Sequence, residues 1–108
     1  MANMLLLGLD SVLADELSRV LRQLGHSTTA AARHDAALQV GHFDLIFAGS
    51  DDLGEALTIL PRRPVIVTSR LPDMKSWINA LEAGAADYCG APFEATQVRW
   101  VLNTALAA

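Results

Sequence analysis

The sequence predicts an α/β protein built on a doubly wound parallel sheet with helices on both faces. Short apolar segments of strand length alternate along the chain with segments whose apolar residues recur at helical spacing. Strand and helix alternation predicts parallel pairing, because each return connection then contains a helix and crosses over in the right-handed sense. The strand segments are almost continuously apolar, which is typical of a sheet covered on both faces.

Composition limits the class of protein. The 108 residues are 52% hydrophobic with a net charge of −4 and one cysteine, which predicts a single domain over residues 1–108. No apolar run reaches the roughly 18 residues of a membrane span, the N-terminus lacks a signal peptide's basic segment, and one cysteine fits a reducing compartment. We therefore expect a cytoplasmic protein without membrane contact. The net negative charge and the lack of a stripe of lysines and arginines argue against nucleic-acid binding by this domain alone, because such binding needs positive charge to neutralise phosphates.

The first half of the chain predicts three strands and two helices. Residues 4–9, 26–31 and 43–48 have the length and apolar content of strands. Residues 12–24 carry an amphipathic stripe that ends before Gly25, and Asp10 and Ser11 precede it as helix-capping residue types. Residues 35–40 predict a brief helix that ends at Gly41.

The second half predicts two more strands and three helices. Residues 53–60 can form two helical turns before Pro61, and the β-branched run 64–69 predicts a strand. A helix follows from Asp73, a short strand occupies 86–89, and a last helix covers 94–106. The apolar stripe of the helix from Asp73 consists of Met74, Trp77, Ile78 and Leu81.

One stretch is more specific than the rest. Residues 81–93 read L-E-A-G-A-A-D-Y-C-G-A-P-F, in which Gly84 can end a helix in the left-handed conformation and Pro92 keeps Ala91 out of the helical region. The stretch resembles the receiver domain of two-component response regulators, where it commonly reads A-L-E-A-G-A-D-D-Y-L-x-K-P-F. The resemblance covers nearly the whole chain and implies a flavodoxin-like (CheY-like) five-stranded parallel sheet of order 2-1-3-4-5, in a protein of phosphorelay signal transduction.

The same resemblance places the phosphorylation-site positions of the family on this sequence. Gly8 and Leu9 fall where the family has its acidic pair, and Gly49 falls at the phosphoacceptor aspartate. Ser69 matches the switch hydroxyl, and Ala91 replaces the lysine before the proline. Only Ser69 keeps the family's residue type. The resemblance therefore implies a degenerate receiver that is not an enzyme, has no cofactor, binds magnesium weakly or not at all and is not phosphorylated.

Three aspartates near these positions leave an alternative open. Asp10 is expected to cap the first helix, and Asp51 and Asp52 are expected to cap the helix that follows them. Alternatively, Asp10 is a relic metal ligand and Asp51 or Asp52 a displaced acceptor, which makes the chain a phosphorylatable receiver with rearranged acids. Arg70 stands where the family usually has a small residue, and we expect it to cover part of the site.

The C-terminal segment predicts an interaction face. At about 100° per residue, Val98, Val101, Leu102 and Ala105 share one face of the last helix, whereas Trp100 points away from it. The helix from Asp73, which carries Trp77, the strand 86–89 and the last helix correspond to the face that receivers commonly use for contact. A signalling protein partner or a homodimer is therefore expected there, with Trp77 and Trp100 as anchors. Tyr88 matches the family's switch aromatic, or it is simply a half-buried tyrosine packed against the helix from Asp73.

The remaining residues with reactive or ligating side chains carry weak signals. His26, His34 and His42 are expected in loops or on the surface, and Cys89 is expected to be an inert core thiol. A small nucleotide- or metabolite-binding module remains a second alternative. The turn after the first strand holds only Gly8, however, and lacks the glycine pattern G-x-G-x-x-G that cradles a pyrophosphate.

Overall fold

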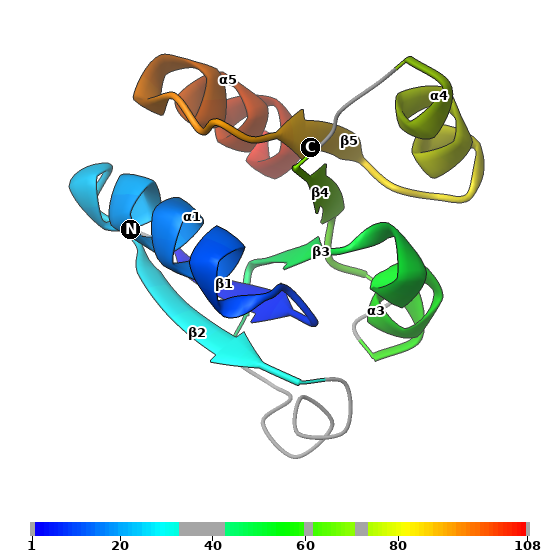
Figure 1. Cartoon of the computed structure of the whole chain (residues 1–108), viewed down its shortest axis with the longest axis horizontal. Helices are drawn as coiled ribbons and strands as arrows, with labels where there is room; N and C mark the ends of the chain where they lie inside the picture. Colours follow the sequence, from blue (N-terminus) through cyan, green and yellow to red (C-terminus); the bar gives the residue numbers. More distant parts are fainter. Residues whose placement is uncertain (1, 33–42, 60–61, 71–73, 108) are drawn as a thin grey trace.

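The computed structural model describes residues 2–32, 43–59, 62–70 and 74–107. Five parallel strands form one sheet of order β2-β1-β3-β4-β5, which confirms the predicted fold class and strand order. Figure 1 shows the sheet running through the middle of the molecule, with helices on either side.

The elements alternate as the sequence predicts. In chain order they are β1 Asn3–Leu7, α1 Ser11–Gln23, β2 Ser27–Ala31, β3 Leu45–Ala48, a 3₁₀ turn Ser50–Asp52 that leads into α3 Leu53–Ile59, β4 Val65–Ser69, α4 Met74–Glu82, β5 Asp87–Gly90 and α5 Ala95–Leu106. Gly25 and Gly84 follow α1 and α4 with φ of 89° and 113°, so each helix ends on a glycine in the left-handed region. None of the described helices is long and apolar enough to cross a membrane.

The bounds differ from the predicted ones by one or two residues at most ends. The two longest disagreements are at the ends of strands, where β1 stops at Leu7 instead of 9 and β3 starts at Leu45 instead of 43. β5 is shifted by one residue, to Asp87–Gly90. The predicted helix 35–40, His34, His42 and Asp73 lie outside the described residues.

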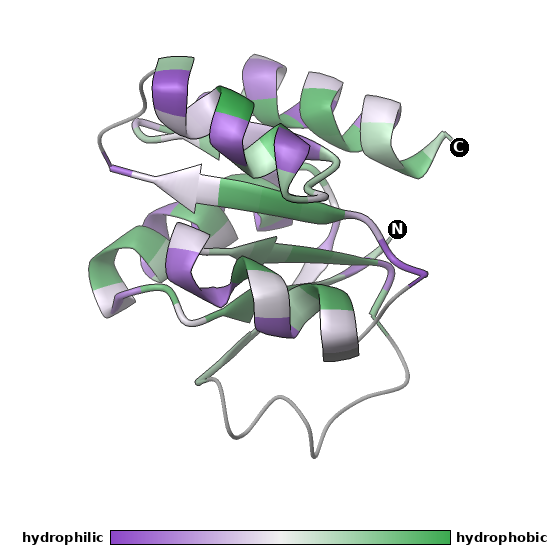
Figure 2. Cartoon of the chain, turned by 90° about the vertical axis from the view of Figure 1, so that its right-hand side faces the viewer, coloured by the Kyte–Doolittle hydropathy of each residue, from purple (hydrophilic) through white to green (hydrophobic). Residues whose placement is uncertain are grey.

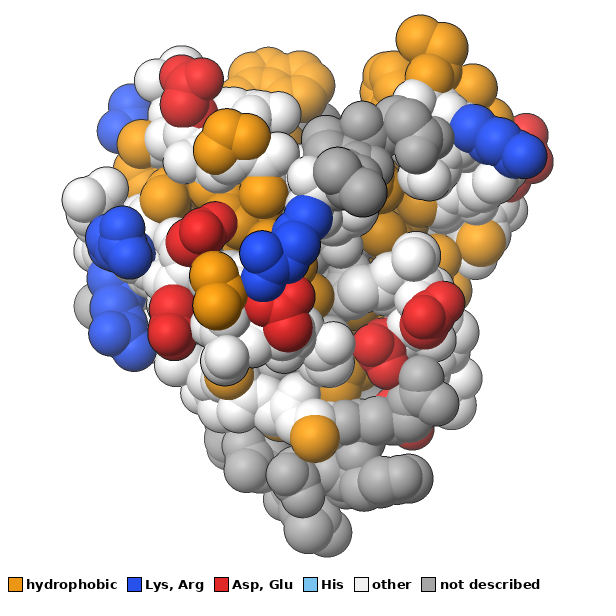
Figure 3. Space-filling model, viewed as in Figure 1, with side chains coloured by type: hydrophobic (Ala, Val, Ile, Leu, Met, Phe, Trp, Pro, Cys, Tyr) orange, Lys and Arg blue, Asp and Glu red, His pale blue; other side chains and the backbone are white. Residues whose placement is uncertain are grey.

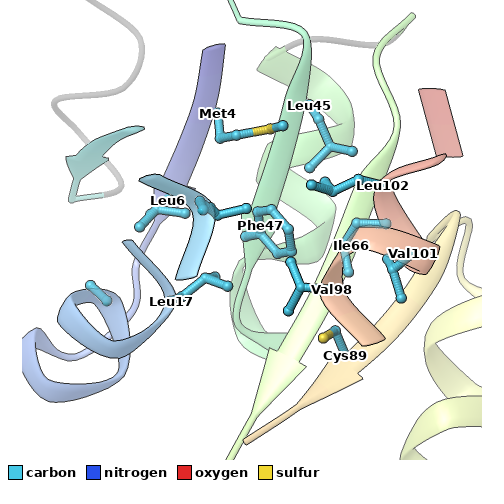
Figure 4. Packing of buried hydrophobic residues seen from close by; sticks show 12 residues of the cluster. Met4, Leu6, Leu17, Leu45, Phe47, Ile66, Cys89, Val98, Val101 and Leu102 are labelled. Carbon is cyan, nitrogen blue, oxygen red and sulfur yellow. The ribbon is translucent and has the colours of Figure 1, made fainter. Parts of the chain in front are cut away.

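Two core clusters sandwich the sheet. The first cluster joins the sheet to α1 and α5 and includes Leu17, Phe47, Val98 and Leu102 (Figure 4). The second joins the other face to α3 and α4 and includes Ile46, Leu53, Ala56 and Ala80. The two helix layers are visible above and below the strands in Figure 2.

β3 is apolar throughout, and most of β1 and β4 is apolar as well, because the side chains of these strands alternate between two buried faces. In β1, Met4 and Leu6 enter the first cluster while Leu5 and Leu7 enter the second. In β3, Leu45 and Phe47 enter the first cluster, and Ile46 and Ala48 the second. This alternation explains why the sequence shows continuous rather than alternating hydrophobicity in these segments.

The apolar stripe of α4 does not face the sheet. Met74, Trp77, Ile78 and Leu81 are 68%, 43%, 45% and 39% exposed, and Ala80 is the buried residue of this helix. Such a stripe normally packs against the core. Here the small side chains of Ala80 and Ala85 make the contact with the second cluster, and the large residues are left on the surface.

Candidate functional site

The carboxyl ends of the strands meet at one edge of the sheet. Parallel pairing sets Leu7 beside Ala48, Ala48 beside Val67, and Ser69 beside Gly90. The residues that follow these pairs therefore lie together, including Gly8 and Gly49. Ligands of open α/β sheets bind at this edge.

A shallow pocket of about 310 Å³ lies there. Its walls are formed by Gly8, Leu9, Asp10, Leu13, Gly49, Ser50, Asp51, Thr68, Ser69 and Arg70. The structure thus brings together four of the five positions at which the family resemblance places phosphorylation-site residues. The fifth, Ala91, lines a different pocket, although its backbone N–H donates to the carbonyl of Ser69 at 2.9 Å.

Asp52 occupies the space where a side chain at position 8 would lie. A Cβ on Gly8 would come within 2.2 Å of Oδ2 and 2.6 Å of Cγ of Asp52, and one on Gly49 would lie 3.6 Å from the same Oδ2. Asp52 itself is 9% exposed. Gly8 also has a φ of 69°, which side chains rarely tolerate. A buried carboxylate therefore does lie beside positions 8 and 49, but it comes from the turn after β3.

Asp10 and Arg70 close one side of the pocket with an ion pair. Nε of Arg70 donates to Oδ2 of Asp10 at 3.1 Å, and a second guanidinium nitrogen bonds Oδ1. The hydrogen bonds from Arg70 and, next, from the backbone N–H of Leu13 hold the pKa of Asp10 below its usual value, and the pair raises the pKa of Arg70. Both side chains are about half exposed, so solvent screens the pair.

Asp10 has the expected capping role, whereas the N-cap of the helical run after β3 is a glycine. Oδ1 of Asp10 accepts the Leu13 N–H at 2.9 Å, which makes Asp10 the N-cap of α1. The helical run after β3 begins at Ser50, three residues earlier than expected, with Gly49 as its N-cap. Asp51 and Asp52 therefore lie inside its first turn, where negative charge still interacts favourably with the helix dipole.

A buried hydroxyl also lies in this pocket. Thr68 is 2% exposed, and its Oγ1 has no hydrogen-bond partner among the residues that the structure describes. Ser69, the expected switch residue, is half-buried beside it. Sequence reasoning did not single out Thr68, because a threonine inside a β-branched run is read as an ordinary strand residue.

The residues at this edge do not fit a magnesium ion. Magnesium takes oxygen ligands in a near-ideal octahedron. Asp52 lies against the backbone of Gly8, in the space that a metal-binding side chain at position 8 would use, and Asp10 is engaged by a guanidinium. Within residues 2–32, 43–59, 62–70 and 74–107, no three histidine, cysteine or acidic side chains gather as a metal would require.

The residues predicted for an interaction face lie on α4, β5 and α5. Trp100 is 63% exposed while Val98, Val101 and Leu102 are buried, as the helical spacing predicts. Tyr88 is half-buried and packs against the second core cluster, to which α4 contributes Ala80. The structure also brings Trp77, Tyr88 and Trp100 to a single pocket of about 720 Å³ between the two helices, a convergence that spacing along the chain did not reveal.

Comparisons with known proteins identify the fold. No family model and no curated protein matches the sequence. Among solved structures, the chain is similar to a two-component response regulator from Clostridium difficile, with 21% identity, a TM-score of 0.78 and coverage of 99% of this chain and 97% of that one. A response regulator receiver domain protein from Clostridium thermocellum gives 21% identity, a TM-score of 0.82 and coverage of 99% and 95%.

A third structure extends the comparison to a larger protein. NtrX from Brucella abortus in complex with ADP is 25% identical with a TM-score of 0.83, over 98% of this chain but only 26% of NtrX. The similarity thus falls on about a quarter of that protein. Together with the strand order 2-1-3-4-5 and the two helix layers, these similarities show that the chain has the fold of response regulator receiver domains.

Proposed function

We propose that this chain is a degenerate receiver domain of two-component signalling, which is not phosphorylated and acts by binding another protein. One observation supports the proposal most strongly. Gly8 and Gly49 stand at the acid and phosphoacceptor positions implied by the resemblance, and the carboxylate of Asp52 fills the space beside Gly8. No enzymatic activity and no cofactor are part of this proposal.

The chemistry of aspartyl phosphorylation explains why these residues matter. The reaction needs an accessible carboxylate nucleophile and positive charge to balance the phosphoryl oxygens. Gly49 offers no nucleophile, and Ala91 offers no cation. The guanidinium of Arg70 is nearby but is already paired with Asp10.

A second candidate function rests on Asp52. Its carboxylate is the one that lies against both Gly8 and Gly49, so it is the acid best placed to accept phosphate in a rearranged site. Its exposure of only 9% argues against attack on a bulky phosphodonor. The two candidates differ in whether the chain gains a phosphoryl group.

Incubation with acetyl phosphate and magnesium, read by intact mass, separates the two. We expect no mass gain, whereas a competent receiver domain in the same tube gains one phosphate. A hydroxylamine-labile gain that disappears in Asp52→Asn but persists in Asp51→Asn would overturn the proposal in favour of the second candidate. Millimolar magnesium alone is expected to leave the melting temperature unchanged.

The proposed contact surface is the face formed by α4, β5 and α5, and the partner is a signalling protein or a second copy of the chain. Four large apolar side chains of α4 and Trp100 of α5 are exposed on these elements. Figure 3 shows hydrophobic side chains standing over both helices along the upper edge of the view. Exposed apolar patches of this kind mark interaction sites.

The alternative of a nucleotide-binding module has less support. The turn after β1 is held by a hydrogen bond from the Gly8 N–H to the Ala31 carbonyl at 2.9 Å, and the carboxylate of Asp52 lies beside it. A carboxylate in that place repels phosphate. A thermal-shift screen with nucleotides is expected to give no stabilisation.

A further inference from the structure

The pocket between α4 and α5 combines aromatic and acidic side chains. It is formed by Met74, Trp77, Asp87, Tyr88, Gly90, Ala91, Pro92, Glu94, Gln97, Trp100 and Val101. These residues come from three elements and the segment that joins β5 to α5. We refer to this hollow as the aromatic-acidic pocket.

The aromatic residues of the chain divide sharply by location. Phe43 and Phe47 are buried in the core, and Phe93 packs partly buried against the first cluster. Both tryptophans and the one tyrosine of the chain line the aromatic-acidic pocket instead. Trp77 and Trp100 are 43% and 63% exposed, so a large part of each side chain is accessible to a ligand.

The charge of the pocket has one sign. Asp87 and Glu94 line it, and no lysine or arginine of the described residues does. Lys75 and Arg99 are sequence neighbours of Met74 and Trp100, but a step of about 100° around a helix turns them away from the pocket.

The two carboxylates differ in what already binds them. Oδ1 of Asp87 accepts the backbone N–H of Tyr88 at 2.7 Å, which restrains the orientation of this carboxylate. Glu94 is the N-cap residue of α5, yet its side chain makes no capping hydrogen bond. Its exposed carboxylate is therefore not engaged in capping its own helix.

Electron-rich ring faces beside carboxylates recognise organic cations. A cation over a tryptophan face is attracted by the ring quadrupole, and a planar guanidinium can stack on an aromatic ring while it hydrogen-bonds a carboxylate. The hydroxyl of Tyr88 is buried without a partner among the described residues, so Tyr88 contributes its ring and not its polar tip.

The surroundings indicate a segment of protein rather than a small free cation. Ile78 and Leu81 of α4 are 45% and 39% exposed but do not line the pocket, so the apolar surface extends past it. A ligand that covers them must be longer than one cation. The net charge of −4 also favours approach of a basic partner.

We propose that the aromatic-acidic pocket receives an arginine side chain from a basic partner segment, whose flanking apolar residues cover the exposed stripe of α4. This inference rests on the proposed function, because it names the partner for the same face. It does not depend on whether the chain is phosphorylated.

Two tripeptides that differ in one charge test the proposal. Acetyl-Leu-Arg-Leu-amide and its citrulline counterpart have nearly the same shape, but citrulline is neutral. The two tryptophan indole N–H resonances report binding directly, since the chain has only two tryptophans. We expect both resonances to shift with the arginine peptide and an affinity about tenfold above that of the citrulline peptide.

Variants assign the selectivity to named side chains. The double variant Asp87→Asn, Glu94→Gln is expected to remove the preference for the arginine peptide. Trp100→Leu is expected to weaken that preference while keeping an apolar contact. Glu82→Gln is the matched control, because it removes an exposed acid of α4 outside the pocket and should change nothing. Circular dichroism checks that each variant is folded.

Four results would overturn the proposal. Equal affinity for the two peptides, or a preference unchanged by the double variant, would show that charge is not recognised. Equal binding of acetyl-arginine-amide without the leucines would indicate a small cation as the ligand. A dimer in sedimentation that already protects both indoles would make a second copy the occupant. Failure of the proposed function appears separately, as a mass gain with acetyl phosphate.

Discussion

The contact between Gly8 and Asp52 differs from what the family resemblance implies at the end of β1. An acid is absent at the end of β1, and one from the turn after β3 reaches into the same space. Gly8 permits this in two ways, because it has no Cβ to collide with Asp52 and it tolerates a φ of 69°. The edge of the sheet therefore holds a buried carboxylate, from the turn after β3, beside a glycine at position 8.

Restoring an acid at position 8 should damage the fold rather than repair the site. Gly8→Asp places a Cβ within 2.2 Å of the Asp52 carboxylate and strains the backbone. We expect the free energy of unfolding to fall by about 2–3 kcal/mol in a urea titration.

A double-mutant cycle separates the causes. Asp52→Ala should recover part of the loss in Gly8→Asp, because it removes the collision and the like charge while the strained φ remains. Gly8→Ala distinguishes collision from charge. Additive effects of the changes at positions 8 and 52 would contradict the contact between them.

At the scale of elements, α5 and α4 use their apolar residues in opposite ways. α5 buries Val98, Val101 and Leu102 and exposes Trp100, so its periodicity predicts its orientation correctly. α4 carries an equally clear stripe but contacts the second cluster through Ala80. The difference shows that periodicity reveals which residues share a face, whereas the space available against the sheet decides which face is buried.

Neighbouring residues of α5 should therefore respond differently to the same substitution. Trp100→Glu is expected to leave the circular dichroism spectrum unchanged and to weaken self-association or partner capture, because Trp100 is 63% exposed. Val101→Glu buries an unpaired charge in the first cluster and should cost more than about 3 kcal/mol of folding stability.

Sedimentation velocity and thermal melts measure both effects. If Trp100→Glu unfolds the chain, Trp100 belongs to the core and the interaction face is wrong. If it folds and associates as the parent chain does, Trp100 is not an anchor of that contact.

At the scale of the whole molecule, Cys89 reports on the integrity of the first core cluster. Cys89 is fully buried. Burial and, next, the negative charge of Asp87 raise its pKa to about 11. A raised thiol pKa means that the folded state favours the neutral form. Stability is therefore complete below the pKa of the unfolded thiol and declines as the pH rises through about 11.

Alkylation of Cys89 should consequently follow global unfolding. Near pH 8, where an ordinary thiol is partly ionised, we expect iodoacetamide to label the folded chain far more slowly than the chain in urea. Intact mass measures the extent of labelling. Rapid labelling without urea would show that the β5 edge opens independently of the remaining sheet.

The sequence alone determined the fold and the nature of the site's residues. Alternation of strands and helices predicted the parallel sheet, and the resemblance of the chain to receiver domains, closest over the stretch 81–93, implied the strand order that the structure shows. The glycines at positions 8 and 49 and the alanine at 91 were also visible, as was the capping role of Asp10.

The tertiary structure decided which side chains share space. The contact of Asp52 with Gly8, the pairing of Asp10 with Arg70 and the convergence of Trp77, Tyr88 and Trp100 each join residues distant in sequence. Spacing cannot predict such contacts, because they depend on strand register and on how each helix is rotated against the sheet. For the same reason, only the tertiary structure decides that the α4 stripe faces outward, because Ala80 is the residue of this helix that packs against the core.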